Sequence, residues 1–153
     1  MSHIEQIDVT IADLEALKAA CERLGVQFLA NKKTYTWFGR SVGDYKLPEG
    51  FTAEELGHCE HAIKVPGVNY EVGVVPSKTA PGKFTLLYDF WGIPHSKASP
   101  HDGHKLKEKF GAGLTKLIDA YSVEALKRKA RAKGYMCQEK TVEGKIVLTV
   151  KGF

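Results

Sequence analysis

Histidine and cysteine, the side chains that most often bind zinc, gather in two short segments of this chain. His58, Cys59 and His61 stand at the start of a predicted strand, and His101 and His104 stand in and after a later loop. A tetrahedral zinc site needs four ligands, and two loops that meet at one edge of a sheet could supply them. The spacing within the segments matches no standard zinc motif. The alternative interpretation is two exposed polar loops, with His104 at the start of a helix.

The same cluster offers little support for catalysis. Metal-assisted reactions also use a general base, and no clear candidate accompanies these histidines. Cys59 and a histidine could form a nucleophile and its base. However, the sequence lacks the glycine-rich phosphate loops and the Gly-x-Ser-x-Gly elbow of known enzyme classes. We therefore favour a non-enzymatic protein, and zinc is the one cofactor that the residues suggest.

A second group of residues combines aromatic rings with charges at the ends of two predicted strands. If both strands end at the same end of the sheet, an indole ring could stack on a base while nearby cations bind a phosphate. The predicted binding residues are Lys32, Lys33, Trp37, Arg40, Asp89 and Trp91. The alternative interpretation is that Trp37 and Trp91 are packing residues of the sheet.

Positive charge is concentrated in one segment of the chain. The net charge is +4, but residues 97–133 hold ten Lys or Arg against four Asp or Glu, a local charge of +6. A basic helical face of this kind can bind nucleic acid, a nucleotide or an acidic protein partner. A solvated helix face is the alternative interpretation, since no recognised nucleic-acid motif is present.

Length and composition are those of one globular domain. The chain has 153 residues, of which 43% are hydrophobic and 26% are charged, and these values allow a substantial core and argue against disorder. No apolar run reaches the roughly 18 residues of a membrane span, and the first residues lack the pattern of a signal peptide. Three scattered cysteines are too few for a disulfide framework. We expect a cytoplasmic protein without a membrane partner.

Apolar periodicity and turn residues predict the order of the elements. The pattern Glu-Ala-Leu-Lys followed by glycine occurs at residues 15–25 and 124–134, and each copy predicts a helix that ends at its glycine. Thr10 is the predicted cap of the first helix, and Ser122 that of a separate last helix. A further helix is predicted between residues 106 and 121. Strands are predicted at residues 3–11, 26–38, 61–65, 69–75, 83–91, 135–142 and 145–151.

Two loops rich in glycine and proline interrupt this order at about residues 41–58 and 92–103. The first loop contains a helical turn that Thr52 and Glu55 are predicted to cap. The element order is β-α-β-β-β-β-α-α-β-β. This order indicates a single α+β domain over residues 1–153, with helices packed on one face of a mostly antiparallel sheet.

The two ends of the chain carry a resemblance to a known family. Its marks are residues 1–4 with the helix that begins near Leu14, then residues 120–124, Gly134 and residues 143–149. In these segments the chain resembles the uncharacterised "hypothetical chloroplast reading frame" family, with relatives in cyanobacteria, plastids, other bacteria and tailed phages. The resemblance implies a small intracellular α+β protein and no established reaction. It makes the two long loops insertions, which favours a phage-encoded member.

Three functions follow as expectations. The first is a non-enzymatic binding or accessory protein that docks a macromolecular partner, a protein in the first place, through its sheet and basic helices. The second is a protein that binds a small anionic ligand such as a nucleotide. The third is a metal-binding protein that uses the histidine and cysteine loops.

Overall fold

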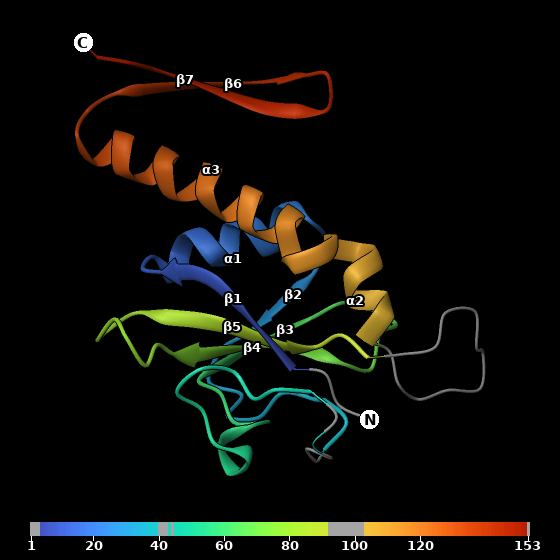
Figure 1. Ribbon diagram of the computed structural model, residues 1–153. Coiled ribbons are helices and arrows are strands. Elements are labelled where there is room, and N and C mark those ends of the chain that lie inside the picture. Colours follow the sequence, from blue (N-terminus) through green and yellow to red (C-terminus); the bar gives the residue numbers. More distant parts are fainter. Residues whose placement is uncertain (1–3, 40–42, 44, 92–102, 153) are drawn as a thin grey trace.

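The computed structural model describes the chain except for residues 1–3, 40–42, 44, 92–102 and 153 (Figure 1). The predicted α+β class is confirmed. The strands are β1 (Ile4–Ile11), β2 (Gln27–Leu29), β3 (His61–Lys64), β4 (Glu71–Pro76), β5 (Phe84–Asp89), β6 (Met136–Val142) and β7 (Lys145–Lys151). The helices are α1 (Leu14–Arg23), α2 (Gly103–Phe110) and α3 (Thr115–Ala132), with short 3-10 turns η1 (Ala53–Glu55) and η2 (Ala112–Leu114).

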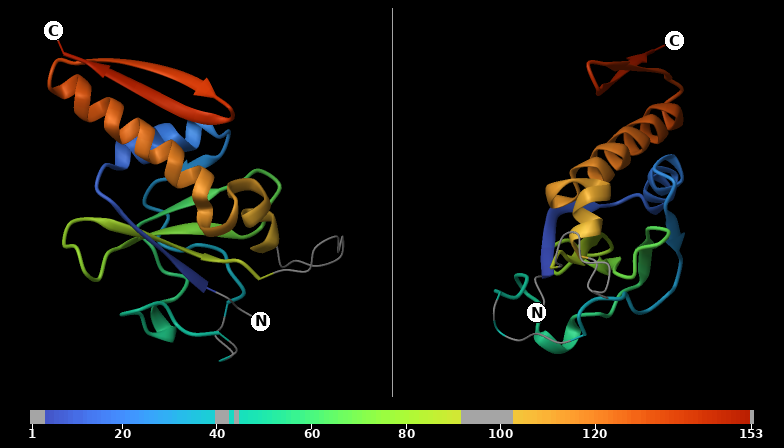
Figure 2. Two further views of the ribbon diagram at one scale, coloured as in Figure 1. Left: turned by 45° about the horizontal axis from the view of Figure 1, so that its top comes forward. Right: turned by 90° about the vertical axis from the view of Figure 1, so that its right-hand side faces the viewer.

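Five strands form the main sheet, in the order β1-β5-β4-β3-β2, and every neighbouring pair is antiparallel. Helix α1 carries the chain from the edge strand β1 to the opposite edge strand β2. The strands β2 to β5 then return as a meander, so β5 ends beside β1. The register pairs Ile7 with Leu86, and it shifts between Ile7 and Ile11. Helices α1, α2 and α3 lie over one face of this sheet, as predicted (Figures 1 and 2).

The main sheet is buried on both faces. Alternating residues such as Ile63 and Ala62, or Leu86 and Leu87, belong to separate apolar clusters on its two sides. The larger cluster lies between the sheet and the helices. The smaller cluster lies under the long connection between β2 and β3, which crosses the other face (Figure 1). This loop therefore replaces a second layer of helices.

The predicted strand over residues 26–38 is wrong in its length. Strand β2 covers only three residues, and an isolated bridge joins Thr34 to His58. Tyr35 instead lies flat against β4, where a side chain on Gly73 would come within 2.4 Å of its ring. A β-branched and aromatic run thus packs onto a sheet face instead of joining the sheet edge. The predicted capping box of η1, formed by Thr52 and Glu55, is confirmed.

Asp13, not Thr10, caps helix α1. The Asp13 carboxylate accepts a hydrogen bond of 3.1 Å from the Ala16 amide, while β1 continues to Ile11 and pairs it with Phe84. Sheet pairing therefore decides where the helix can begin. The predicted glycine stop is confirmed, since Gly25 follows the helix with a φ of 71°.

The predicted start of a separate last helix at Ser122 is wrong. Helix α3 is continuous through this residue, and the break falls earlier, at Gly111 and Gly113. Both glycines have positive φ, a conformation that interrupts an α-helix and that glycine adopts without steric penalty. Tyr121 is buried beside Ser122, and this packing outweighs the preference of serine for helix starts. In the described part of the chain, no helix has the length and apolar character of a membrane-spanning segment.

Strands β6 and β7 form a separate two-stranded sheet, which we call the ribbon. Its turn at Glu143 and Gly144 has positive φ at both residues, as the predicted tight hairpin requires. The ribbon lies on α3, on the side away from the main sheet (Figures 1 and 2). Among the described elements, it is the outermost layer on this side of the molecule.

Candidate functional site

The structure does not bring His58, Cys59 and His61 around one point. Cys59 is buried in the smaller apolar cluster, and His58 is exposed. His61 turns to the opposite sheet face, where its ring lies 5.2 Å from that of Phe28. Its Nδ1 accepts a hydrogen bond of 3.0 Å from the Asn31 amide.

The other predicted zinc ligands do not complete a site within the described residues. His104 is half-buried in the first turn of α2, and His101 lies outside the described residues. Among the residues that the structure describes, no group of three His, Cys, Asp or Glu side chains could hold a metal ion. The zinc site, which includes His101, therefore stays a prediction.

The chemistry of Cys59 also fits packing better than ligation. Burial raises the pKa of its thiol to about 11, and burial raises that of Cys21 to about 12. Both thiols are therefore protonated at neutral pH, whereas nucleophiles and metal ligands are thiolates.

The two predicted tryptophan segments do meet at one end of the sheet. Asp89 is fully buried between them, and its carboxylate accepts hydrogen bonds from the amides of Phe38 (3.1 Å) and Trp91 (3.0 Å). The ring of Trp91 lies 6.3 Å from that of Phe38. Trp37 packs over Gly57 and the smaller apolar cluster. Asp89 and both indoles thus contribute to packing here, and Arg40 lies outside the described residues.

Lys32 and Lys33 both face carboxylates. Lys32 Nζ lies 2.5 Å from the buried Glu71, whose same oxygen accepts hydrogen bonds of 2.9 Å from the amide and the hydroxyl of Thr36. Burial alone raises the pKa of Glu71, but the bonds from Lys32 and Thr36 outweigh it and hold the pKa below its ordinary value. Lys33 lies 3.6 Å from Glu60. These cations therefore neutralise the protein's own carboxylates.

The ribbon presents a different surface, because alternation gives it two unlike faces. Cys137, Glu139, Ile146 and Leu148 are half-buried toward α3. Their neighbours along each strand lie on the opposite face of the ribbon and are all exposed, and one of them, Lys145 at the turn, also lines the groove described below. We call this set the outer ribbon face, and it consists of Met136, Gln138, Lys140, Val142, Lys145, Val147, Thr149 and Lys151.

The outer ribbon face carries positive charge and no carboxylate. Among the described residues, none of Lys140, Lys145 and Lys151 forms an ion pair. The apolar side chains between these lysines are open to solvent, and Met136 is 59% and Val147 is 45% exposed. The face thus mixes uncompensated cations with exposed apolar side chains.

The last turns of α3 extend this charge. Lys129, Arg131 and Lys133 are exposed, and in the described part of the chain they too lack ion pairs. Positive side chains near a helix C-terminus also stabilise the helix dipole. The basic segment that the sequence shows therefore leads directly into the ribbon.

Ion pairs fix the ribbon to the helices beneath it. Arg23 of α1 lies 3.0 Å from Glu124 of α3 and also pairs with Glu139 of β6. Lys127 of α3 lies 3.4 Å from the second oxygen of Glu139. One arginine thus joins three elements that are distant in the sequence.

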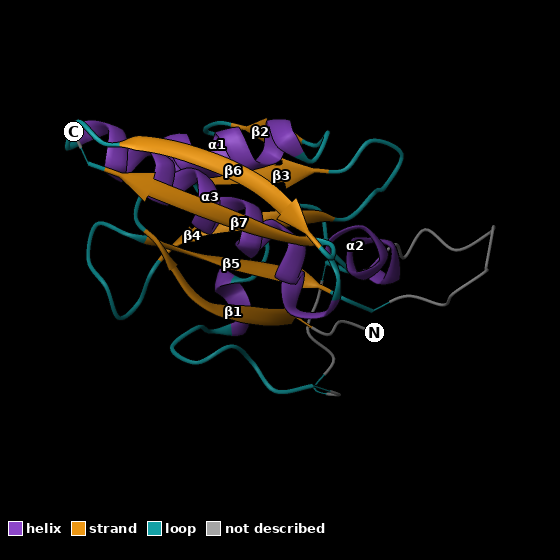
Figure 3. Ribbon diagram, turned by 90° about the horizontal axis from the view of Figure 1, so that it is seen from above, coloured by secondary structure: helices purple, strands orange, loops and turns teal. Residues whose placement is uncertain are grey.

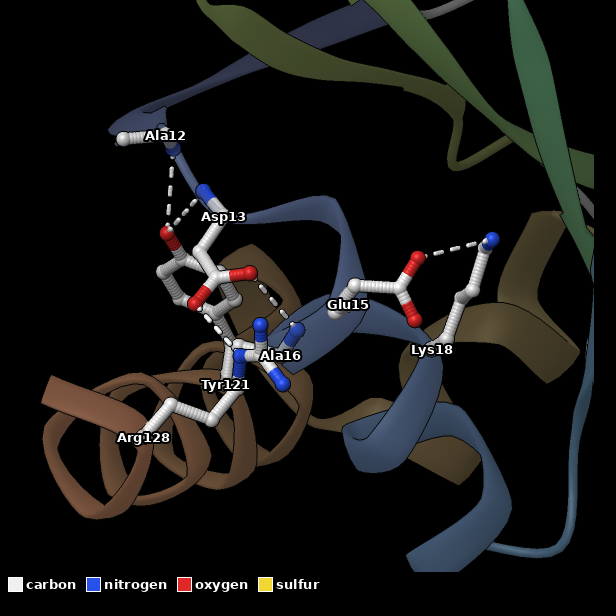
Figure 4. A network of polar contacts seen from close by, with 7 residues as sticks. All are labelled: Ala12, Asp13, Glu15, Ala16, Lys18, Tyr121 and Arg128. Carbon is white, nitrogen blue, oxygen red and sulfur yellow. Dashed lines mark hydrogen bonds and ion pairs between the residues drawn. The ribbon is translucent and has the colours of Figure 1, made fainter. Parts of the chain in front are cut away.

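A second polar contact fixes α3 to the start of α1 (Figure 4). The Tyr121 hydroxyl accepts hydrogen bonds from the amides of Ala12 (3.0 Å) and Asp13 (3.2 Å), and Arg128 lies 2.8 Å from the Asp13 carboxylate. Burial alone raises the pKa of Asp13, but the bonds from Arg128 and Ala16 outweigh it and lower the pKa. The helix that supports the ribbon is therefore held at both ends of α1.

A groove of about 540 Å³ lies between α1, α3 and the turn of the ribbon. Arg23, Lys116 and Lys145 place three cations around it, against the single carboxylate of Asp119. Its remaining walls are mainly apolar. The residues predicted from the sequence to bind a ligand or a metal include none of those that line this groove or form the outer ribbon face. Strand alternation around the turn at Glu143 and Gly144 was the signal that could have revealed the exposed lysines.

Comparisons with known proteins identify no relative of this chain. No family model matches the chain, and no curated protein or solved structure is significantly similar to it. The family resemblance of the two chain ends stays a prediction.

Proposed function

We propose that this chain is a non-enzymatic docking protein that binds an acidic macromolecule through its C-terminal module, which consists of α3 and the ribbon. The observation that carries the proposal is the outer ribbon face. No described element covers it (Figures 1 and 2). It holds three lysines that make no ion pair among the described residues, and none of its eight positions carries a carboxylate. Such a surface attracts a negatively charged partner.

The rest of the molecule supports this proposal, because it forms a scaffold that holds the ribbon in place. Within the described part of the chain, apolar clusters cover both faces of the main sheet and leave no broad sheet surface for a partner. A two-stranded hairpin is at best marginally stable alone. Here Arg23 and Lys127 hold its inner face on the helices, which leaves the outer face ordered and open.

Charge also argues against a second copy of the chain as the occupant. Facing copies would place the three lysines of one outer ribbon face against those of the other. Like charges at short distance are destabilising. The proposed partner is therefore acidic.

Affinity capture with the full-length chain tests the proposal. The test variant carries Lys140→Glu, Lys145→Glu and Lys151→Glu. The matched control carries Lys46→Glu, Lys83→Glu and Lys109→Glu, which reverse three exposed lysines elsewhere. We expect one reproducible protein or nucleic acid on wild type and control that is lost from the ribbon variant. Identical recoveries from all three chains would contradict the proposal.

The groove supports a second candidate, the binding of a small anionic ligand near Arg23, Lys116 and Lys145. Thermal-shift screening against phosphates and nucleotides tests it. A ligand at 100 times its dissociation constant stabilises the folded chain by about 2.7 kcal/mol. The shift should disappear in Lys116→Ala, and a flat panel would remove this candidate.

A further inference from the structure

We propose that the partner of the outer ribbon face is double-stranded DNA, with the ribbon inserted in the major groove. This inference rests on the proposed docking function and names the class of its partner. The major groove of B-DNA is about 12 Å wide and admits a two-stranded β-ribbon. Paired strands lie about 4.8 Å apart, which leaves room for side chains on either side.

The position of the ribbon suits insertion. Seen from above, β6 and β7 form the topmost layer, with α3 beneath them (Figure 3). The side views agree that no other described element covers the ribbon (Figures 1 and 2). A duplex could therefore approach the outer ribbon face without meeting the main sheet.

The chemistry of the face matches base edges and phosphates. Gln138 and Thr149 are directly opposite each other near the base of the ribbon, and amide and hydroxyl groups both bond to base edges in the major groove. Val147 is opposite Lys140, and an apolar side chain of this kind can contact the methyl group of thymine. The face thus offers polar groups for bases beside cations for the backbone.

The cations are spread along the ribbon as a phosphate contact requires. Lys145 and Lys151 are six residues apart on β7, a span of roughly 20 Å at the rise of a strand. Lys129, Arg131 and Lys133 lie on the part of α3 that leads into the ribbon. These additional side chains would bind phosphates that flank the groove.

A protein partner fits this surface less well. Protein interfaces are enriched in aromatic residues and depleted of lysine, whereas the outer ribbon face has three lysines and no aromatic residue among its eight positions. Nucleic-acid interfaces are instead strongly positive and polar. The composition of the face therefore favours DNA over an acidic protein.

Fluorescence anisotropy of the full-length chain with a labelled mixed-sequence duplex of about two helical turns tests the inference. We expect wild type and the Lys46, Lys83 and Lys109 control to bind at low salt. The Lys140, Lys145 and Lys151 reversal should weaken binding by roughly tenfold or more. It should also reduce the slope of log K against log salt by about 2.7, because each phosphate contact contributes about 0.9. Circular dichroism should show that all three chains are folded.

Two further measurements test insertion in the groove. The pair Gln138→Ala and Thr149→Ala should weaken binding and leave the salt slope unchanged, because these side chains contact bases. A duplex with bulky substituents at C5 of its pyrimidines, which fill the major groove, should bind more weakly than the plain duplex. Equal binding of the two duplexes would overturn insertion.

The remaining outcomes separate this inference from the proposed function. If wild type does not bind the duplex, but captures an acidic protein that the ribbon variant loses, the inference fails and the docking function stands. If the charge-reversal control loses duplex binding as fully as the ribbon variant, the attraction is not specific to the ribbon and the inference fails. If neither duplex nor any captured partner depends on the ribbon, both proposals fail.

Discussion

Two buried carboxylates on the main sheet, Glu71 and Asp89, attach the long loop between β2 and β3 to the sheet. Glu71 holds Lys32 and Thr36, and Asp89 holds the amide of Phe38. Both carboxylates accept several hydrogen bonds, which is the arrangement that makes a buried charge tolerable. The sequence predicts that Lys32 and Asp89 bind a ligand. In the structure, Lys32 pairs with Glu71, and Asp89 accepts hydrogen bonds from backbone amides.

Substituting Glu71→Gln should lower the free energy of unfolding at pH 7 by about 1–3 kcal/mol, because bonds to a charged group are lost. The wild-type contribution should also depend on pH. Because folding lowers the pKa of Glu71 below 4.5, the unfolded chain takes up its proton first as the pH falls. The contribution is therefore complete above pH 4.5 and disappears as the pH falls through the folded-state pKa.

Chemical denaturation of wild type and Glu71→Gln from pH 3 to 7, a range of about four units that includes the carboxylate pKa values, measures the difference in their free energy of unfolding. Glu60→Gln is the control. Among the described residues, the Glu60 side chain forms an exposed ion pair with Lys33, so this substitution should change stability by less than about 1 kcal/mol. A wild type and a Glu71→Gln chain with parallel pH profiles would contradict the assignment.

The three thiols should differ in reactivity. Cys21 and Cys59 are buried with raised pKa values, and Cys137 is half-buried on the ribbon. A thiol reagent at pH 8 should therefore modify Cys137 readily and the other two only after denaturation. Mass spectrometry of the peptides after timed labelling gives the order. Fast labelling of Cys59 in the folded chain would show that its loop opens, and it would reopen a role as ligand or nucleophile.

At the scale of elements, the residues that end a helix or form a turn could be predicted from the sequence, whereas features that depend on tertiary packing could not. Gly25, Gly134 and the turn at Glu143 and Gly144 mark element ends through their own backbone preferences, and all three were predicted correctly. The helix start predicted at Ser122 is wrong because the burial of neighbouring residues keeps α3 continuous. The strand predicted over residues 26–38 is too long because β-branched and aromatic residues can pack on the face of a sheet as well as extend its edge.

The candidate site shows the same division. The meeting of the two tryptophan segments was predictable from strand ends. The role of Asp89 was not, because it depends on which backbone amides the fold brings to it. The outward lysines follow from alternation around the turn, but their lack of partners depends on where the ribbon lies on α3.

The ribbon's attachment should depend on Arg23. Arg23→Ala removes the ion pairs to Glu124 and Glu139, and partly exposed pairs contribute up to about 1 kcal/mol. Amides of β6 and β7 should then exchange with solvent about fivefold faster, while those of the main sheet are unchanged. Hydrogen exchange with mass spectrometry resolves the two regions. Lys18→Ala, which removes the exposed pair with Glu15 on the same helix, is the control and should leave the ribbon unchanged.

At the scale of the whole molecule, the chain divides into a core around the main sheet and the ribbon, which lies outside that core. The two apolar clusters hold the main sheet, its helices and the covering loop together. No residue beyond α3 belongs to either cluster among those described. Stability and partner binding are therefore assigned to different parts of one chain.

Removing residues 134–153 should leave a folded protein. The main transition in thermal or chemical denaturation should stay cooperative, with stability lower by about 2 kcal/mol, because Ile146 and Leu148 are only half-buried and the ion pairs are partly exposed. Circular dichroism during heating measures the transition. Its loss would show that the ribbon is part of the core after all.

The pairing of β1 with β5 has a consequence for how the chain is made. Among the described strands, β1 pairs with β5, so it cannot form this ladder until residues 84–89 have been synthesised. The core thus depends on contacts between distant segments, and such contacts slow folding. The ribbon depends on no distant partner to form its ladder, because it closes around its own turn, and hairpins form within roughly 1–10 μs. The surface that we propose for the partner therefore belongs to the part of the described fold whose strand pairing is the most local.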